Sequence, residues 1–234
     1  MTAPVIARHD GILVARDDLY PGGTKARFLQ LLFMHANEVA YASPAEGGAQ
    51  TALAHAARDA GKRATIFVAK RAVPHARGLM AKRLGAQVLQ VSPGYLSVVQ
   101  ARCRAYCAAT GAFMVPFGAD MPEAIEAIAG AAKAADVAPD EVWCASGSGV
   151  LARALAMAYP LARRHVVQIG RELSARDVLG ARIHVHPLKF GQACKHRPPF
   201  PSDPHYDAKA WEICLRKRGS GTVLFWNVTG PAEP

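Results

Sequence analysis

The sequence has few cysteines and no long apolar run. Its five cysteines are an odd number at irregular spacing, which argues against a disulfide framework and is typical of reduced thiols in a cytosolic protein. No window of about 18 uninterrupted apolar residues occurs, so no membrane-spanning helix is predicted. The N-terminal MTAPVIARHDG lacks the apolar stretch of a secretory signal peptide. We therefore expect a cytoplasmic protein without a membrane partner.

Acidic residues are also scarce. The 234 residues include 28 Lys and Arg against 18 Asp and Glu, which gives a formal net charge of +10. Residues 1–150 carry 15 basic and 12 acidic side chains, and residues 151–234 carry 13 and 6, so the two parts are +3 and +7. The hydrophobic fraction of 51% excludes a disordered chain. The basic C-terminal part favours an anionic partner, such as a phosphorylated ligand or DNA, although many basic enzymes have no such partner.

Short β-rich runs alternate with Ala-rich helical patterns along the chain. Helices are predicted at 51–60 and at 75–86, where Gly85 stands at the expected C-cap. This alternation predicts an α/β fold with a mainly parallel sheet flanked by helices. The predicted strands are residues 11–15, 38–42, 64–69, 86–91, 112–117, 141–146, 165–169, 181–186 and 222–226.

The segment EVWCASGSGVLARALAMA (141–158) is predicted to run from a strand through a Gly-rich turn into a helix. Backbone N–H groups in such a turn, together with a helix N-terminus, bind phosphate. A β-carbon at Gly147 or Gly149 would block the close approach of an anion, and Ser146 and Ser148 can add hydroxyl donors. An ordinary strand-to-helix turn explains the pattern equally well, and the dinucleotide and Walker fingerprints are absent.

A second candidate is Lys25, which lies at the start of an apolar helix in DDLYPGGTKARFLQLL (17–32). For a single lysine, a solvated side chain in the first helical turn is the commoner interpretation. A nucleophilic role is favoured if burial or a cationic neighbour lowers the amine pKa, and Arg27 is two residues away.

DDLYPGGTKARFL resembles the lysine segment of fold type II (tryptophan synthase beta-like) pyridoxal-phosphate (PLP) enzymes. The similarity is to the branch of aminocyclopropanecarboxylate deaminase and D-cysteine desulfhydrase. Residues 42–71 resemble the helix and strand that follow the cofactor lysine. Three further motifs resemble the family in the same order along the chain: SGSG (146–149), DPHYDAKAWE (203–212) and FWNVTG (225–230).

Position by position, the resemblance implies PLP as cofactor. Lys25 would form the internal aldimine and move the substrate proton. The phosphate would be held by Gly147, Ser148, Gly149 and Val150, with Ser146 beside them.

The resemblance also assigns residues around the cofactor ring. Tyr206 would act in proton transfer, Asp207 would protonate the pyridine nitrogen, and Thr229 would add a hydrogen bond. A carboxylate at that nitrogen makes the ring a strong electron sink. Taken alone, Tyr206 and Asp207 are more simply a turn and a helix cap after Pro204.

The chain departs from the family pattern in two ways. Where relatives have a Ser-Asn element, this chain has residues 46–50 (EGGAQ), so Gly48, Gln50 and Thr51 become the substrate-binding candidates. The chain is also shorter than its relatives, which predicts a reduced second lobe and an open, basic cleft. Such a cleft would admit an amino acid attached to a nucleotide in DNA, as in phage-type hypermodification.

Metal binding is the weaker interpretation of the remaining His and Cys residues. His184, His186, Cys194 and His196 have zinc-like spacing, but alternation in ARIHVH is a strand pattern that needs no metal. Cys103 and Cys107 are more simply core residues of one helix. No metal site is therefore predicted. Residues 187–205 are rich in proline and too long for a routine connection, which is typical of a loop beside an active site.

We therefore expect a single PLP-binding α/β unit over 1–234, with a smaller lobe at roughly 38–116 and a larger lobe from the N-terminal segment and 117–234. The expected function is a PLP-dependent lyase, deaminase, decarboxylase or isomerase of amino-acid metabolism, acting at the substrate α-carbon. The alternatives are the same chemistry on an amino-acid-modified base in DNA, and a non-catalytic nucleic-acid-binding protein. A homodimer is expected from the resemblance.

Overall fold

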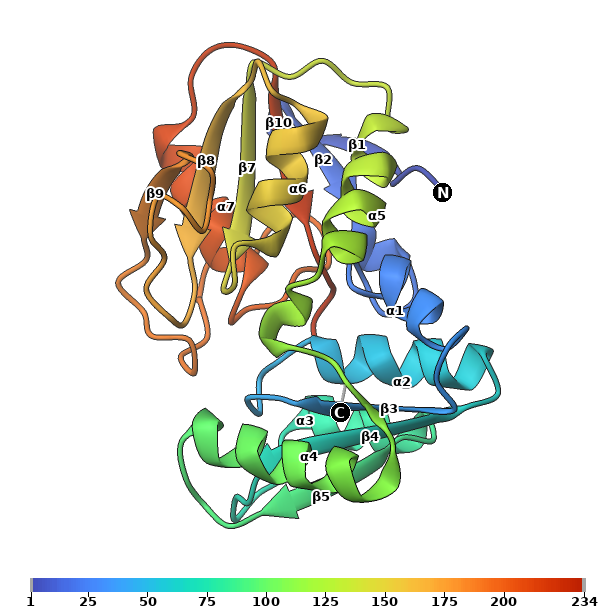
Figure 1. Ribbon diagram of the computed structural model, residues 1–234. Helices are drawn as coiled ribbons and strands as arrows, with labels where there is room; N and C mark the ends of the chain where they lie inside the picture. The colour runs from blue at the N-terminus through green and yellow to red at the C-terminus, as the bar shows by residue number, and fades with distance from the viewer. Residues whose placement is uncertain (1, 233–234) are drawn as a thin grey trace. The chain divides into compact units, whose positions relative to one another are not determined.

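The computed structural model describes residues 2–232, which form two compact units. The terminal unit combines the residues up to Thr24 with Asp120–Pro231, and the central unit is formed chiefly by Lys25–Ala119. Each unit has its own sheet with helices on both faces (Figure 1). This confirms the predicted α/β class. The smaller lobe predicted at roughly 38–116 falls inside the central unit, which begins earlier, at Lys25.

The terminal unit contains a six-stranded sheet in the order β1-β2-β10-β7-β8-β9. All neighbouring strands are parallel except β1 and β2, which form an antiparallel hairpin. Asp10 and Gly11 form its turn, both with positive φ, as a two-residue hairpin requires. The sequence interpretation missed β1. The strands are β1 (Ile6–His9), β2 (Ile12–Arg16), β7 (Glu141–Ser146), β8 (Arg163–Gln168), β9 (Arg182–Val185) and β10 (Val223–Asn227).

Helices α5 (Pro122–Lys133) and α6 (Val150–Ala158) cover one face of this sheet, and α7 (Asp207–Lys217) covers the other (Figure 1). Helix α7 packs Trp211 edge-on against Phe225 of β10, with ring centroids 5.1 Å apart. Both side chains are fully buried. Because α7 runs antiparallel to the strands that it covers, its first residues lie at the edge where those strands end. A short 3-10 helix, η1 (Asp17–Leu19), follows β2.

The central unit has a wholly parallel four-stranded sheet in the order β5-β4-β3-β6. Its strand β6 is only two residues long, and a 3-10 helix, η2 (Phe117–Ala119), follows Pro116. The strand predicted over 112–117 is therefore wrong in its second half, because proline cannot donate to the ladder. The strands are β3 (Glu38–Ala42), β4 (Arg63–Ala69), β5 (Gln87–Val91) and β6 (Phe113–Met114); the helices are α1 (Ala26–Leu32), α2 (Ala49–Asp59), α3 (Ala76–Arg83) and α4 (Leu96–Thr110).

Two sequence expectations can be read directly from the structure. All five cysteines are free thiols. Within residues 2–232, no helix has the length and apolar character to cross a membrane.

Glu38 is a buried carboxylate that joins β3 to β4 and α4. Its Oε1 accepts the hydroxyl groups of Thr65 and Tyr106, each at 2.6 Å, and its Oε2 pairs with Arg63 at 2.9 Å. Burial opposes ionisation of Glu38, but the hydrogen bonds from Thr65 and Tyr106 and the charge of Arg63 outweigh it and lower the pKa. The ionised form thus stabilises the central unit.

We expect Glu38→Gln to lower the free energy of unfolding by about 1–3 kcal/mol, because it weakens charge-assisted hydrogen bonds to three elements. Since the folded pKa is below the ordinary value, the contribution is present at neutral pH and is lost as pH falls through the folded pKa. Denaturant unfolding at pH 7 and pH 4 measures both effects. Asp59→Asn, in an exposed ion pair of the same unit, serves as the control. Equal stability of the two variants at pH 7 would contradict this role.

Candidate active site

The ends of β2, β7 and β10 lie at one edge of the terminal sheet. The three strands are neighbours and parallel, in the order β2-β10-β7, so their carboxyl ends share an edge, which is where open α/β sheets bind ligands. Each strand is followed by one of the motifs found in the sequence. The lysine segment follows β2, the Ser-Gly-Ser-Gly turn follows β7, and Thr229 follows β10.

The turn after β7 is shaped by Ser146 and Gly149. The Gly149 N–H donates to Ser146 Oγ at 2.9 Å, so the buried serine hydroxyl holds the turn closed. Gly149 has a φ of +89°, and a β-carbon there would collide with the carbonyl oxygen of Asp177, so only glycine fits. Helix α6 begins at the next residue, Val150. The first N–H groups of a helix have no partner within it and carry partial positive charge, which suits a phosphate.

Tyr206 is attached to the same turn. Its hydroxyl oxygen accepts the Gly147 N–H at 2.9 Å. Burial, followed by the charge of Asp207, raises the pKa of the Tyr206 hydroxyl. The hydroxyl therefore keeps its proton at neutral pH and can donate it in a further hydrogen bond at the edge of the turn.

Asp207 is fully buried as the first residue of α7. Its Oδ2 accepts the Thr229 N–H at 3.3 Å, whereas its Oδ1 has no hydrogen-bond partner among the described residues. Burial, followed by the charge of Asp203, raises the pKa of the Asp207 carboxyl well above its ordinary value. A buried carboxyl oxygen without a donor is unfavourable by itself. It fits a ligand that presents a cationic N–H group.

The chain that leads into Lys25 is anchored at the end of β10. The Thr24 N–H donates to Val228 O at 3.0 Å, and Trp226 Nε1 donates to Thr24 Oγ1 at 3.0 Å. Gly23 has a φ of +71°, and a β-carbon there would collide with Val228 O. The two glycines before the lysine thus have a structural reason, since the backbone passes against residues 228–229. Lys25 follows directly as the half-buried N-cap of α1.

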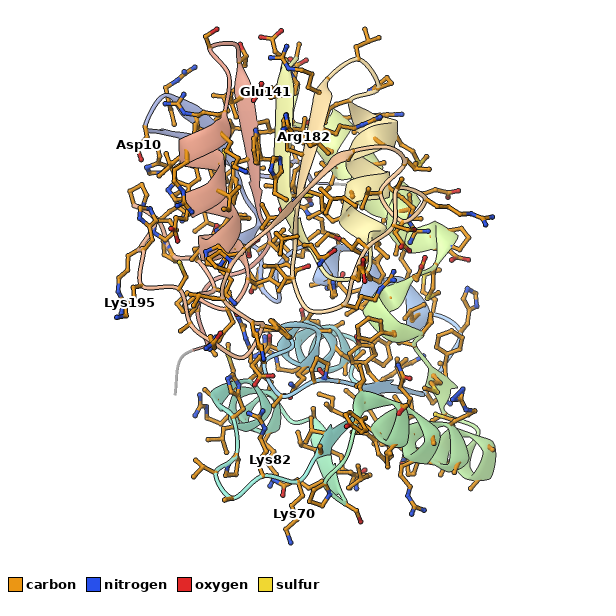
Figure 2. All side chains as sticks on the ribbon, turned by 90° about the vertical axis from the view of Figure 1, so that its left-hand side faces the viewer. Asp10, Lys70, Lys82, Glu141, Arg182 and Lys195 are labelled. Atoms are coloured by element: carbon orange, nitrogen blue, oxygen red, sulfur yellow. The ribbon has the colours of Figure 1, made fainter. Side chains whose placement is uncertain are left out.

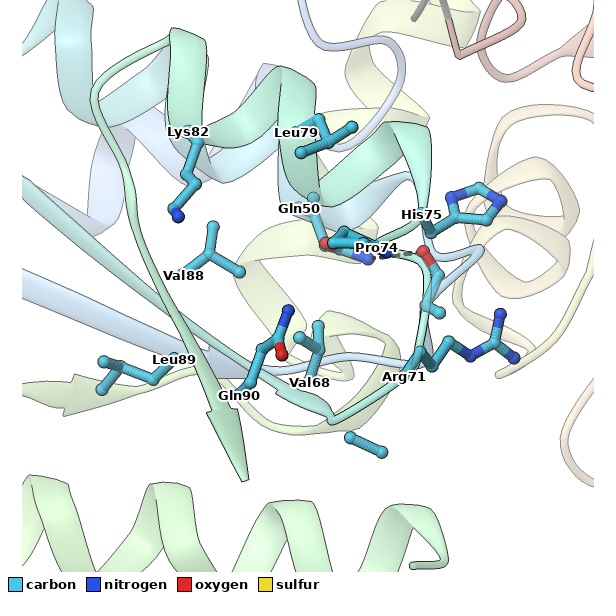
Figure 3. A pocket seen from close by; sticks show the side chains of 13 residues that line it. Gln50, Val68, Arg71, Pro74, His75, Leu79, Lys82, Val88, Leu89 and Gln90 are labelled. Carbon is cyan, nitrogen blue, oxygen red and sulfur yellow. Dashed lines mark hydrogen bonds between the residues drawn. The ribbon is translucent and has the colours of Figure 1, made fainter. Parts of the chain in front are cut away.

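The predicted substrate-binding residues lie at the N-terminus of α2. Gln50 Nε2 donates to Pro44 O and Ala45 O, each at 2.9 Å, and Thr51 Oγ1 donates to Gly48 O at 3.0 Å. These groups hold the loop before α2. Gln50 Oε1 has no hydrogen-bond partner among residues 2–232, and the side chain lines a cavity of about 380 Å³ in the central unit (Figure 3). Substrate binding by these residues remains a prediction.

The sequence motifs thus fall into two groups. The phosphate turn, Tyr206, Asp207 and Thr229 come together within the terminal unit, whereas Lys25 opens the central unit, which also contains Gly48, Gln50 and Thr51.

Two positioning residues escaped the sequence interpretation. Asp17, fully buried, accepts the Thr24 hydroxyl at 2.7 Å and the Trp226 indole N–H at 3.1 Å. Asp203 donates its N–H to Thr229 O at 3.1 Å and accepts the His205 N–H on Oδ1 at 2.7 Å. Each lies inside a motif that was recognised, but its partners are distant in sequence, so only the fold reveals its role.

A phosphate-binding turn, a buried carboxyl for a cationic nitrogen and a lysine in a Gly-Gly-Thr-Lys segment define a protein that binds a phosphorylated, nitrogen-containing aromatic cofactor. The profile of one family, described as pyridoxal-phosphate dependent enzyme, matches residues 2–221. The chain belongs to this family, so PLP is its cofactor and it is of an enzyme class. A comparison with curated protein sequences finds no match.

Solved structures of this family have the same fold. An ACC deaminase homologue superposes with a TM-score of 0.80 at 16% identity, covering 94% of this chain and 84% of that chain. A threonine deaminase from T.th. gives 0.74 at 16% identity, with 98% and 92% covered. Threonine deaminase isoform 2 from Solanum lycopersicum gives 0.72 at 13% identity, with 96% and 75% covered. These likenesses confirm the fold type II architecture inferred from the motifs.

The described residues fit PLP. The unpartnered Oδ1 of Asp207 suits a protonated pyridine nitrogen, and the turn at Gly147–Val150 suits the phosphate. Both lie at the same sheet edge of the terminal unit, which requires no rearrangement of its strands.

We expect Gly149→Ala to weaken PLP binding at least about tenfold, because the new β-carbon would push the turn away from Asp177 and misplace the phosphate donors. Gly85→Ala is a matched control, since Gly85 has a φ of +93° with open space around it and reports only the left-handed backbone strain. Fluorescence titration with PLP measures both affinities. Equal affinities would contradict a phosphate role for the turn.

We expect Asp207→Asn to stabilise the cofactor-free protein and to weaken PLP binding at least about tenfold. Because the folded pKa is raised, the folded state keeps a proton that the unfolded chain releases, so wild-type stability declines as pH rises above the ordinary carboxyl pKa. Asparagine removes that decline, but it cannot form an ion pair with a protonated ring nitrogen. Thermal unfolding from pH 5 to pH 8 and PLP titration test this, with exposed Asp136→Asn as control. Parallel pH profiles, or unchanged PLP affinity, would show that Asp207 has another role.

Proposed function

We propose that the protein is a PLP-dependent enzyme that acts at the α-carbon of an amino-acid substrate, as a lyase, deaminase, decarboxylase or isomerase. The observation that carries the proposal is Asp207, whose buried Oδ1 is left without a donor beside Thr229. A carboxylate at this point keeps the cofactor nitrogen protonated. Bound PLP then supplies a ring that accepts the electron pair left when a bond to the α-carbon breaks.

Each candidate residue has a distinct task under this proposal. Lys25 Nζ holds the cofactor covalently and afterwards carries the substrate α-proton, which its place after the anchored Thr24 supports. The N–H groups from Ser148 to Val150 bind phosphate. The Tyr206 hydroxyl, kept protonated by burial, donates at the phosphate end and holds the turn to α7.

The substrate class is supported by the family and by similar structures. The named neighbours are deaminases, and a further one, diaminopropionate ammonia lyase from Escherichia coli, superposes with a TM-score of 0.65. We propose a free amino acid as the substrate. The departure at residues 46–50, where Gln50 is committed to the loop, implies a different contact for the substrate carboxylate.

The alternative substrate, an amino-acid-modified base in DNA, is favoured by one observation. Basic side chains are exposed along the terminal unit, and Lys195 extends from the irregular loop at its outer side (Figure 2). The exposed basic residues of this region are Arg163, Arg171, Arg176, Arg182, Lys189, Lys195, Arg197, Arg216 and Lys217. Because Arg163, Arg171 and Arg216 pair with acidic residues, the free amino acid stays the main proposal.

We expect the purified protein to absorb at about 410–430 nm, with the band fixed to Lys25 by borohydride and absent from Lys25→Ala. Lys70→Ala, at an exposed position of the same unit, should keep the band. The measurement is the absorbance spectrum, followed by peptide mapping after reduction. A colourless protein that takes up no added PLP would refute the proposal.

The two substrates are separated by solvent-deuterium exchange at the α-carbon. Free amino acids are tested in one arm, and a duplex bearing an amino-acid-modified base is tested in the other. Exchange only in the duplex, with a salt-dependent mobility shift, would replace the free amino acid by the DNA alternative.

A further inference from the structure

Three metal-ligating side chains meet in the terminal unit, away from the residues assigned to PLP. His186 follows β9, Cys194 lies in the proline-rich segment 187–205, and Glu212 lies on α7. His186 and Cys194 are buried and Glu212 is partly buried. Segments from three parts of the chain thus converge on one point.

The ligand atoms are already close together. Glu212 Oε2 lies 3.2 Å from His186 Nε2 and 3.1 Å from Cys194 Sγ, and the three ligand atoms lie within 4.8 Å of one another. In a tetrahedral zinc site, the bond lengths to nitrogen, oxygen and sulfur place neighbouring ligand atoms about 3.3–3.6 Å apart. A metal ion would therefore require shifts of only a few tenths of an ångström between the two close pairs.

We propose that His186 Nε2, Cys194 Sγ and Glu212 Oε2 form a binding site for Zn²⁺ or a similar divalent transition metal, with water in the fourth position. The donor set selects this class of ion. Thiolate and imidazole are ligands of zinc, whereas Mg²⁺ and Ca²⁺ prefer oxygen alone.

Metal binding rearranges two protons. Without metal, the Leu188 N–H donates to His186 Nδ1 at 3.1 Å, so the ring proton is on Nε2. On binding, this proton moves to Nδ1 and the Cys194 thiol releases its proton to solvent, so one proton is released per ion. The site gives up one backbone hydrogen bond and gains three metal–ligand bonds, which are much stronger. Arg216 continues to hold the other Glu212 oxygen, at 3.0 Å.

The location gives the ion a structural purpose. Segment 187–205 is long and irregular, and it is tied to its surroundings by the Cys194 N–H to Pro204 O at 2.8 Å and by Lys209 Nζ to Lys189 O at 2.8 Å. A metal ion would add a link from the middle of this segment to α7. The site extends the proposed function without depending on it.

His184 and His196, which share the zinc-like spacing, are not part of the cluster. His184 stacks on Trp143 with ring centroids 4.9 Å apart and contacts His165 at 3.1 Å. His196 is exposed. The site therefore uses a different set from the one that spacing suggested.

The test is metal content of the purified protein, followed by titration of metal-stripped protein with Co²⁺. We expect one metal ion per chain, a thiolate-to-cobalt charge-transfer band and the visible bands of tetrahedral cobalt. Cys194→Ser and His186→Gln should each weaken Co²⁺ binding at least about tenfold. The half-buried Cys107→Ser should leave it unchanged.

Folding of each variant is checked by circular dichroism, and the zinc-dependent rise in melting temperature gives an independent readout that should vanish in Cys194→Ser. Folded wild type without a thiolate-cobalt spectrum would overturn the proposal. A spectrum retained in Cys194→Ser and lost in Cys107→Ser would place the metal at Cys103 and Cys107 and would also overturn it. PLP absorbance, recorded on the same samples, distinguishes loss of this site from loss of the proposed enzyme site.

Discussion

The pairing of β10 between β2 and β7 is the constraint on which the site depends. It places the last strand of the chain beside one of the first, with Phe225 opposite both Val14 and Trp143. Because all three strands are parallel, the segments that follow them emerge at one edge. Thr24 then reaches Val228, and Thr229 reaches Asp207. Residues that are far apart in the sequence become neighbours only because the final strand enters the middle of the sheet.

The same packing keeps Asp207 in an unfavourable environment. A carboxyl group in an apolar site tends to take up a proton, and Asp203 nearby strengthens that tendency. The residue cannot move to solvent, because Trp211, Ala210 and Cys214 of the same helix are buried in the core of the terminal unit. Core packing of α7 thus holds a polar group where a cationic ligand can use it. Such local conflict within a well-packed fold is typical of a binding site.

The sequence predicted element type and motif position better than side-chain orientation. The strands 38–42 and 141–146 occur with the predicted bounds, because both are buried throughout and read as continuous apolar runs. The β1 hairpin was missed although Asp10-Gly11 is its signal, since IARH is short and lacks clear alternation. Gln50 and Tyr206 were located, but nothing in the sequence shows that the amide turns to Pro44 or the hydroxyl to Gly147. Orientation depends on partners that only the tertiary structure supplies.

Helix α7 connects the two sites of the terminal unit. Asp207 is its first residue and Glu212 lies on the same helix, so any link between segment 187–205 and Glu212 acts on the helix that positions Asp207. The segment also leads directly into Tyr206 through Pro204, whose carbonyl accepts the Cys194 N–H. Spacing within 184–196 could not reveal this arrangement, because the third ligand comes from a helix further along the chain. A proline-rich segment loses less backbone entropy on ordering, and a few strong contacts are then enough to fix the residues that it carries into the site.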